Sequence, residues 1–121
     1  MSQYQMGPIE SRFADLIWGK APVTAAELAR ETEALLGWKK TTTYTVLKRL
    51  CDKGIFQNEK GTVTSLISRE EFATAQSERF VADNFGGSLP AFLAAFSRSK
   101  RLSEREAERL LRLVAEFRED E

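Results

Sequence analysis

The fold is decided by residues 38–54, which have the sequence Trp38-Lys-Lys-Thr-Thr-Thr-Tyr-Thr-Val-Leu-Lys-Arg-Leu-Cys-Asp-Lys-Gly54. On a helical wheel, which advances by about 100° per residue, positions 41–53 divide into two arcs. One arc is polar and holds Thr41, Thr42, Thr45, Lys48, Arg49, Asp52 and Lys53, whereas the opposite arc holds Thr43, Tyr44, Val46, Leu47, Leu50 and Cys51. This complete separation predicts an amphipathic helix over about 41–53, with Gly54 as its terminator.

The polar arc favours contact with DNA over the alternative of a plain surface helix, which more often carries Glu and Lys than a run of threonines. A major groove about 12 Å wide admits a helix with such a narrow polar side. The short hydroxyl side chains of Thr41, Thr42 and Thr45 let the backbone come close to base edges, where they hydrogen-bond bases or phosphates and present methyl groups to thymine. Lys48 and Arg49 suit phosphates, and Arg49 has the alternative role of bracing a carboxylate within the domain.

The distribution of charge agrees with this interpretation. The chain of 121 residues has a formal net charge of zero, which by itself argues neither for nor against a nucleic-acid partner. Residues 38–60, however, carry six basic and two acidic side chains, a net charge of +4, and the segments on both sides are acidic. One short segment therefore concentrates the positive field, as a compact DNA-contacting element does.

The surrounding segments predict three helices followed by a hairpin. A first helix is expected from about Ile9 to Trp18. A second is expected from Ala25 to about Leu36; it is capped by Thr24 and buries Leu28, Leu35 and Leu36. After Gly54, the stretches 55–59 and 62–68 favour strands around a turn at Lys60-Gly61. We therefore expect a mainly α fold with a small β-hairpin wing (α+β), in which residues 1–68 form a winged helix-turn-helix DNA-binding domain.

Residues 69–121 are expected to form a helical dimerisation region. Two apolar stripes at helical spacing are larger than a domain of about 70 residues needs to close its own core, and monomers avoid exposing such patches. They consist of Leu89, Phe92, Leu93 and Phe96 in one helix, and of Leu110, Leu111, Val114 and Phe117 in the next. Burial against a second copy is the economical solution, and folding back onto the same chain is the alternative.

The composition excludes much chemistry. The chain has no histidine and one cysteine, Cys51, so nucleophile pairs with histidine, histidine-containing zinc sites and an internal disulfide are ruled out. We expect no enzymatic activity, no cofactor and no metal site. No apolar run approaches the roughly 20 residues that cross a bilayer, and no signal peptide is visible in residues 1–10. We therefore expect a cytoplasmic protein without a membrane partner.

At this point a family resemblance becomes specific. Residues 38–54 resemble the recognition-helix motif of the penicillinase-repressor family (BlaI, MecI and CopY type), which has tryptophan, threonines at the positions of Thr42 and Thr45, then leucine, Arg-Leu and glycine. The first helix and the two apolar stripes are similar as well, so that the resemblance covers nearly the whole chain. It implies a dimeric winged-helix repressor in which Thr41, Thr42 and Thr45 face the bases and Lys40 lies near the DNA backbone. Trp38 would stack near the sugar-phosphate chain or belong to the core.

The resemblance has limits. The wing lacks the arginine and tyrosine that relatives often carry, although Lys60 and Thr62 remain within reach of phosphates. Antibiotic-responsive members are cut by a sensor-linked protease at an Asn-Phe pair, whose counterpart here is Ala95-Phe96, and the C-terminal cysteine cluster of copper-responsive members is absent. The inducer or sensor protease therefore stays unknown. We expect a transcriptional repressor that binds a palindromic double-stranded operator as a homodimer, with a small-molecule-responsive regulator or a winged helix used for protein–protein contact as alternatives.

Overall fold

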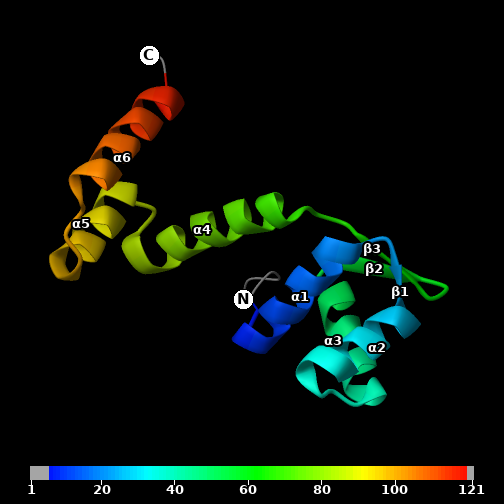
Figure 1. Cartoon of the computed structure of the whole chain (residues 1–121). Helices are drawn as coiled ribbons and strands as arrows, with labels where there is room; N and C mark the ends of the chain where they lie inside the picture. Colours follow the sequence, from blue (N-terminus) through cyan, green and yellow to red (C-terminus); the bar gives the residue numbers. More distant parts are fainter. Residues whose placement is uncertain (1–5, 120–121) are drawn as a thin grey trace. The chain divides into compact units, whose positions relative to one another are not determined.

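The computed structural model describes residues 6–119; residues 1–5 and 120–121, the outer ends of the two expected segments, lie outside the described residues. The chain forms two compact units, residues 1–79 and 80–121, whose elements are labelled in Figure 1. In chain order they are α1 (Pro8–Lys20), β1 (Val23–Thr24), α2 (Ala25–Leu36), α3 (Lys40–Asp52), β2 (Phe56–Glu59), β3 (Thr62–Ser65), α4 (Arg69–Phe85), α5 (Leu89–Ser99) and α6 (Glu104–Phe117). The predicted fold class, mainly α with a small β wing, is confirmed.

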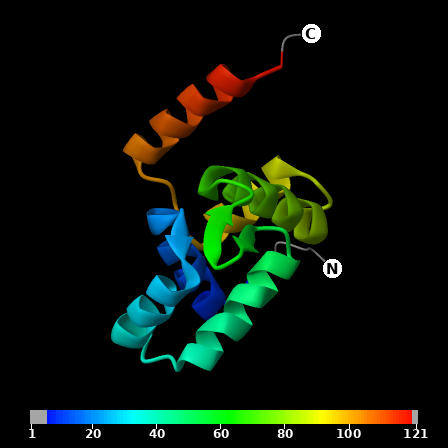
Figure 2. The same cartoon turned by 90° about the vertical axis from the view of Figure 1, so that its right-hand side faces the viewer.

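Local signals in the sequence explain where α2 and α3 begin and end. Thr24 caps α2 because its hydroxyl accepts a hydrogen bond of 3.1 Å from the amide of Glu27. Gly37 ends α2 in the left-handed conformation, with φ of 69°, and Gly54, with φ of 80°, follows the end of α3. Figure 2 shows α2 and α3 joined at one end by the short turn 37–39.

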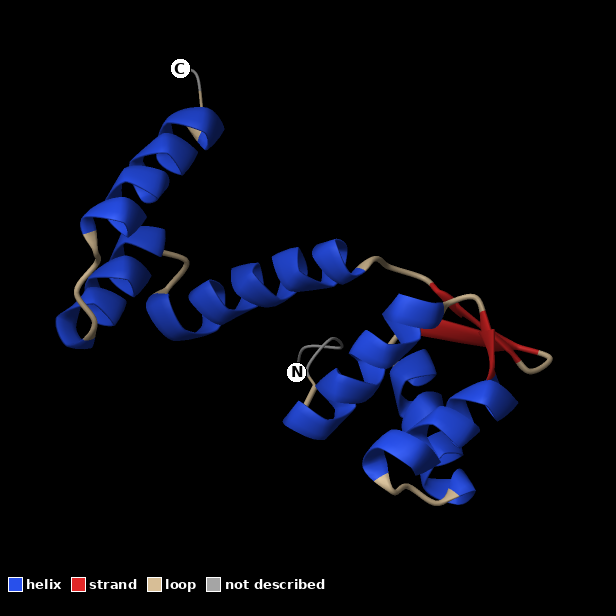
Figure 3. Ribbon diagram, in the orientation of Figure 1, coloured by secondary structure: helices blue, strands red, loops and turns tan. Residues whose placement is uncertain are grey.

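The wing is a three-stranded antiparallel sheet in the order β1-β3-β2, drawn in red in Figure 3. In the hairpin, Asn58 pairs with Val63 and Glu59 with Thr62, and the predicted turn at Lys60-Gly61 has positive φ at both residues, as a tight two-residue hairpin requires. The strands are shorter than the expected 55–59 and 62–68. The sequence analysis also missed β1, because a strand of two residues has too little alternation to detect.

The core of the first unit lies between α1, α2, α3 and the sheet. Its largest fully buried side chains are Phe13, Ile17, Leu28, Leu47, Leu50, Ile55, Phe56 and Val63. Two expectations for α2 were wrong: Leu35 is 61% exposed and Leu36 is only half-buried. The buried side of α2 ends at Thr32, one turn earlier than expected, and the last turn of the helix lies outside the core.

The second unit contains the end of α4 together with α5 and α6. Gly86 and Gly87 both have positive φ and turn the chain between α4 and α5, so that the ring of Phe92 on α5 lies edge-on to Phe80 and Phe85 of α4, at centroid distances of 6.0 and 5.5 Å. Ser88 caps α5, and Ser103 with Glu106 forms a capping box at the start of α6. Within residues 6–119, no helix is long and apolar enough to span a bilayer.

Candidate nucleic-acid interface

One side of α3 is polar and exposed, and the opposite side is buried. The polar face, as we call it below, comprises Lys40, Thr41, Thr42, Thr45, Lys48 and Arg49, all of them exposed. The other side consists of Thr43, Val46, Leu47 and Leu50, all of them buried. The separation predicted from the helical wheel is therefore present for most of the helix. Lys53, assigned to the polar arc, is half-buried and pairs with Glu10 of α1 at 3.6 Å, and Tyr44 and Cys51 of the inner arc are only half-buried.

The threonines of the polar face line a shallow hollow. Its volume is about 280 Å³, and Thr41, Thr42, Thr45, Val46 and Arg49 surround it. Thr45 donates its hydroxyl proton to the carbonyl of Thr41 at 2.9 Å, so that towards a ligand it presents oxygen lone pairs and a methyl group. This combination suits hydrogen-bond donors and methyl groups on base edges.

The cations of the polar face are available to an anionic partner. Lys48 pairs with Asp52 at 3.1 Å, but both side chains are largely exposed, at 77% and 65%, and such pairs contribute little to stability. Arg49 makes no ion pair with any residue between 6 and 119, so its alternative role of bracing a carboxylate is not realised. Lys40 lies 5.8 Å from the centre of the Tyr44 ring, a cation–π contact at the start of the helix.

The wing carries the two remaining candidates, Lys60 and Thr62. Both are exposed at the β2–β3 turn, on a different element from the polar face. Lys60 adopts φ of 53°, which is unusual for a residue other than glycine, and the turn is stabilised by a 3.0 Å hydrogen bond from the amide of Gly61 to the side-chain oxygen of Asn58. The wing therefore presents one cation and one hydroxyl from a well-defined turn.

Two interior contacts place α3, and the sequence analysis had not found either of them. Trp38 is half-buried, and its ring lies 5.2 Å from that of Phe13; of the two roles considered for it, the structure shows the core role. Thr43 is fully buried and its hydroxyl bonds that of Thr32 on α2. Helical spacing placed Thr43 on the inner side of α3, but no spacing rule pairs it with a particular threonine of another helix.

A known protein family matches nearly the whole of the part of the chain that the structure describes. The family model of the penicillinase repressor matches residues 6–116. The chain belongs to the penicillinase-repressor family. It is also similar to the methicillin resistance regulatory protein MecI of Staphylococcus aureus (strain Mu50 / ATCC 700699), with 24% identity over 115 residues that cover 92% of this chain and 94% of that protein. As a member of this family, the protein is a DNA-binding transcriptional regulator of the repressor type.

The start of α3 adds a feature to this repressor's polar face that the sequence analysis had missed. Lys39 is the N-cap residue, is exposed, and makes no capping hydrogen bond through its side chain. The first amides of α3 therefore lack a side-chain acceptor from the cap residue and carry the positive end of the helix dipole. With Lys39 and Lys40 beside them, these amides favour a phosphate group at this end of the helix. The Lys-Lys doublet was the signal for it in the sequence.

The second unit presents an apolar face that its own helices leave uncovered. No residue of α5 or α6 is buried, and the exposed side chains include Leu89 at 62%, Leu111 at 71% and Phe117 at 74%. The eight residues predicted for dimerisation, Leu89, Phe92, Leu93, Phe96, Leu110, Leu111, Val114 and Phe117, are all exposed or half-exposed. We call these eight residues the apolar face. Several of them also line an open hollow of about 290 Å³ between α5 and α6.

Among the described residues, no group of acidic, cysteine or histidine side chains is arranged to hold a metal ion. The lone Cys51 is half-buried at the end of α3. Burial, and then the neighbouring carboxylate of Asp52, raises the pKa of its thiol above the usual value. A thiol in this state is protonated at neutral pH and is a poor nucleophile and metal ligand.

Proposed function

We propose that this repressor binds an inverted-repeat operator as a homodimer, with the polar face of α3 in the major groove of each half-site. The observation that carries the proposal is the threonine-rich polar face of α3, which lies opposite the buried residues Thr43, Val46, Leu47 and Leu50. Such a helix has one exposed side, and that side lacks the aromatic or aliphatic anchors that protein-binding helices usually present. The alternative of a winged helix used for protein contact is therefore disfavoured.

Within the groove, the two kinds of side chain have different tasks. Thr41, Thr42 and Thr45 contact base edges, because their short side chains allow the N-terminal part of α3 to approach the bases closely. Lys40, Lys48 and Arg49 contact phosphates and fix the register of the helix without reading sequence. Lys60 and Thr62 on the wing supply further contacts to the backbone.

The homodimer is supported by the apolar face. A helix pair that exposes Leu111 and Phe117 by more than two thirds is unfavourable in water at about 25 cal/mol per Å² of apolar surface. Burial against the same face of a second copy removes this surface with a closed twofold symmetry. In a dimer of this kind, two recognition helices contact half-sites that lie one turn of DNA or a multiple apart, with about 34–36 Å per turn.

Titrations of variants against two duplexes test the proposal. The first duplex is selected from a random-sequence pool by the wild-type protein, and the second is a scrambled version of it. Thr42→Ala and Thr45→Ala should each cost about 1–3 kcal/mol on the selected duplex and much less on the scrambled one. Lys48→Ala should weaken both about equally and lower the salt slope by about one unit, since a phosphate contact carries no sequence information.

Thr74→Ala is the matched control. Thr74 on α4 donates to the carbonyl of Glu70 at 3.0 Å, which is the same local bond that Thr45 makes to Thr41 at 2.9 Å. Loss of this bond from the helix is therefore common to both variants, and only Thr45→Ala should affect sequence discrimination. Equal losses on the selected and scrambled duplexes for Thr42→Ala and Thr45→Ala would contradict the assignment of the polar face to the bases.

A further inference from the structure

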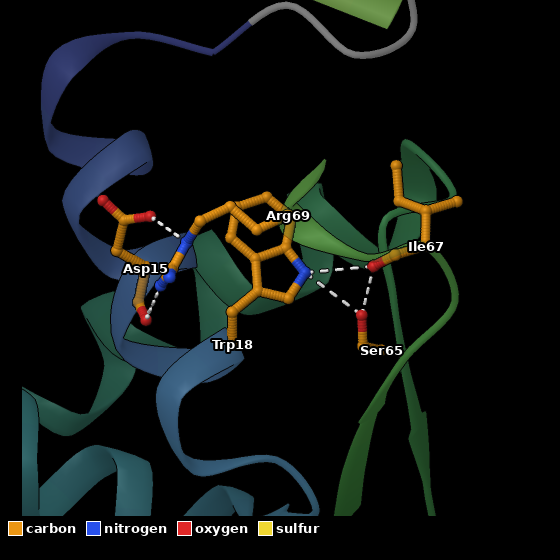
Figure 4. A network of polar contacts seen from close by, with 5 residues as sticks. All are labelled: Asp15, Trp18, Ser65, Ile67 and Arg69. Carbon is orange, nitrogen blue, oxygen red and sulfur yellow. Dashed lines mark hydrogen bonds and ion pairs between the residues drawn. The ribbon is translucent and has the colours of Figure 1, made fainter. Parts of the chain in front are cut away.

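Arg69, the first residue of α4, bridges to α1. Its Nε donates to a carboxylate oxygen of Asp15 at 3.1 Å, and a terminal nitrogen donates to the backbone carbonyl of the same residue, also at 3.1 Å. Its guanidinium carbon lies 5.7 Å from the centre of the Trp18 ring. Figure 4 shows the guanidinium beside Asp15, with the indole next to it. We call the contacts among Asp15, Trp18 and Arg69 the Arg69 bridge.

Trp18 extends this bridge to the wing. Its indole N–H is shared between the hydroxyl of Ser65 at 3.1 Å and the carbonyl of Ile67 at 3.0 Å, and the hydroxyl of Ser65 donates to the same carbonyl. The Trp18 ring also packs on Phe56 of β2 and on Phe72 of α4, at centroid distances of 5.2 and 5.4 Å. One side chain of α1 thus holds the end of β3, the connection to α4 and the first turn of α4.

The connection from β3 to α4 leaves little freedom. It has three residues, 66–68, between the end of β3 and the start of α4. The amide of Leu66 donates to Ile55 at 2.9 Å, Ile67 accepts from Trp18, and Ser68 exchanges hydrogen bonds with Glu71 at 2.8 and 2.9 Å. Every residue of the connection is therefore hydrogen-bonded, and the Arg69 bridge adds a lateral attachment at the point where the helix begins.

The geometry of the Arg69 bridge is better suited to fixing the direction of α4 relative to α1 than to raising the free energy of unfolding. The side chains of Arg69 and Asp15 are 52% and 59% exposed, and ion pairs this exposed contribute little to the free energy of unfolding. However, the guanidinium is a rigid planar fork, and its two bonds reach the side chain and the backbone of one residue. Two hydrogen bonds from a rigid group restrict the angle between α4 and α1, whereas a single hydrogen bond from a lysine would leave that angle free to change.

The direction of α4 matters because the helix crosses from one unit into the other. α4 has 17 residues, so it is about 25 Å long at about 1.5 Å per residue. A tilt of about 10° at Arg69 displaces its far end by about 4 Å, which exceeds the rise of about 3.4 Å per base pair of DNA. Without a constraint on the first turn of α4, the separation of the two half-sites that a dimer can contact would therefore vary by more than one base pair.

We propose that Arg69 is a positioning residue, which fixes the direction in which α4 leaves the winged helix and thereby sets the half-site spacing that the dimer accepts. The proposal rests on the proposed function, because a spacing exists only if a dimer binds two half-sites. It assigns a task in operator selection to residues that are remote in the sequence from the recognition helix. Asp15 and Trp18 are the partners through which Arg69 acts.

The first experiment measures the direction of α4 within one chain, independently of DNA and of dimer formation. Nitroxide labels are attached at Glu33→Cys on α2 and Glu78→Cys on α4 in a Cys51→Ser background, and the labelled protein is diluted into excess unlabelled protein. Pulsed dipolar spectroscopy should give a narrow distance distribution for the otherwise wild-type chain. Arg69→Ala and Asp15→Ala should both broaden it, and Arg69→Lys should broaden it too because the fork is lost. An unchanged width in all three variants overturns the proposal.

The second experiment measures the consequence on DNA. Duplexes carry two inverted copies of the selected half-site, and their separation is changed by single base pairs. The wild type should lose about tenfold in affinity when the separation is shifted, comparable to about one mismatched base pair, whereas Arg69→Ala and Asp15→Ala should lose clearly less. The two substitutions change the net charge in opposite directions, so a general charge effect should shift their affinities for a single half-site in opposite directions. Such an effect cannot weaken the dependence of affinity on half-site separation in both variants.

The outcomes separate this proposal from the proposed function. A wild-type protein that is monomeric, or that selects no inverted repeat, overturns the proposed function and the role in spacing, and the intramolecular distances then decide the positioning of α4 alone. A dimer whose variants keep the wild-type dependence on spacing leaves the proposed function intact and overturns the role of Arg69. Thermal unfolding of each variant, expected to stay close to the wild type because the bridge is exposed, checks that the comparison is made between folded proteins.

Discussion

The hydrogen bond between the hydroxyls of Thr32 and Thr43 predicts which of the two residues is more costly to replace by valine, because each hydroxyl has only one proton to donate. Both side chains are fully buried, and each hydroxyl has one proton to donate. Thr32 donates to the carbonyl of Ala29 at 3.2 Å, which uses its proton, so that Thr43 is the donor in the bond between the two hydroxyls. The two substitutions to valine should therefore differ in their effects.

Thr43→Val removes the donor and leaves Thr32 with its bond to Ala29. It should lower the free energy of unfolding by about 0.5–1.5 kcal/mol, the value of one net hydrogen bond. Thr32→Val removes the acceptor and leaves the buried hydroxyl of Thr43 without its partner, which should cost about 1–3 kcal/mol. In the double variant, methyl groups replace both hydroxyls, so that no buried hydroxyl is left without a hydrogen-bond partner. The double variant should therefore be less destabilised than Thr32→Val alone.

Urea unfolding of the four proteins is measured at one protomer concentration, because the proposed dimer would make the apparent stability depend on concentration. Thr41→Val is the matched control: it makes the same substitution at an exposed position of the same helix and should stay within about 0.5 kcal/mol of the wild type. Additive losses in the double variant would refute the bond between the hydroxyls. A greater loss for Thr43→Val than for Thr32→Val would reverse the assignment of donor and acceptor.

Three further predictions concern the apolar face, Cys51 and induction. Leu93→Asp or Leu110→Asp should give monomers with weakened operator affinity; a wild type that sediments as a monomer at micromolar concentration would defeat the assignment of the apolar face. Because its pKa is raised, Cys51 should react slowly with iodoacetamide at neutral pH, and Asp52→Asn should speed the reaction by lowering that pKa; equal rates would contradict the electrostatic cause. The bond between Ala95 and Phe96 should stay intact in induced cells, because alanine stands where the antibiotic-responsive members have the asparagine of their cleavage pair; a fragment ending at residue 95 would overturn this.

The sequence predicted the parts of the fold that depend on strong local patterns. The division of α3 into a polar and a buried face, the hairpin turn at Lys60-Gly61 and the cap at Thr24 each follow from spacing or from a residue with a distinctive conformation. The sequence-based expectation was wrong for Leu35. Its position fits the helical spacing of the buried side chains, but the neighbouring elements do not extend far enough to cover it. Burial depends on the partners of a helix, and those are set by the tertiary arrangement.

The candidate site was predictable only where its residues are close together in the sequence. The threonines and cations of α3 stand in one stretch, so the helical wheel is sufficient to group them on one face. The contacts that place this stretch come from elsewhere: Phe13 against Trp38, Thr32 against Thr43, and Glu10 beside Lys53. Each joins residues from two parts of the chain, and in a single sequence no spacing rule connects them.

A net charge of zero is compatible with DNA binding because affinity depends on the local field at the contact, and distant charges are screened within about 8–10 Å at physiological salt. In the proposed complex, the exposed cations at positions 39, 40, 48, 49 and 60 face DNA in each protomer. The acidic residues outside the basic segment 38–60 lie mostly on α2, α4 and α6. On α1, Asp15 is paired with Arg69 in the Arg69 bridge. An acidic residue near the polar face, Asp52, instead pairs with Lys48. In the proposed complex, phosphates compete with Asp52 for Lys48, which limits binding to arbitrary DNA and leaves discrimination to the threonines.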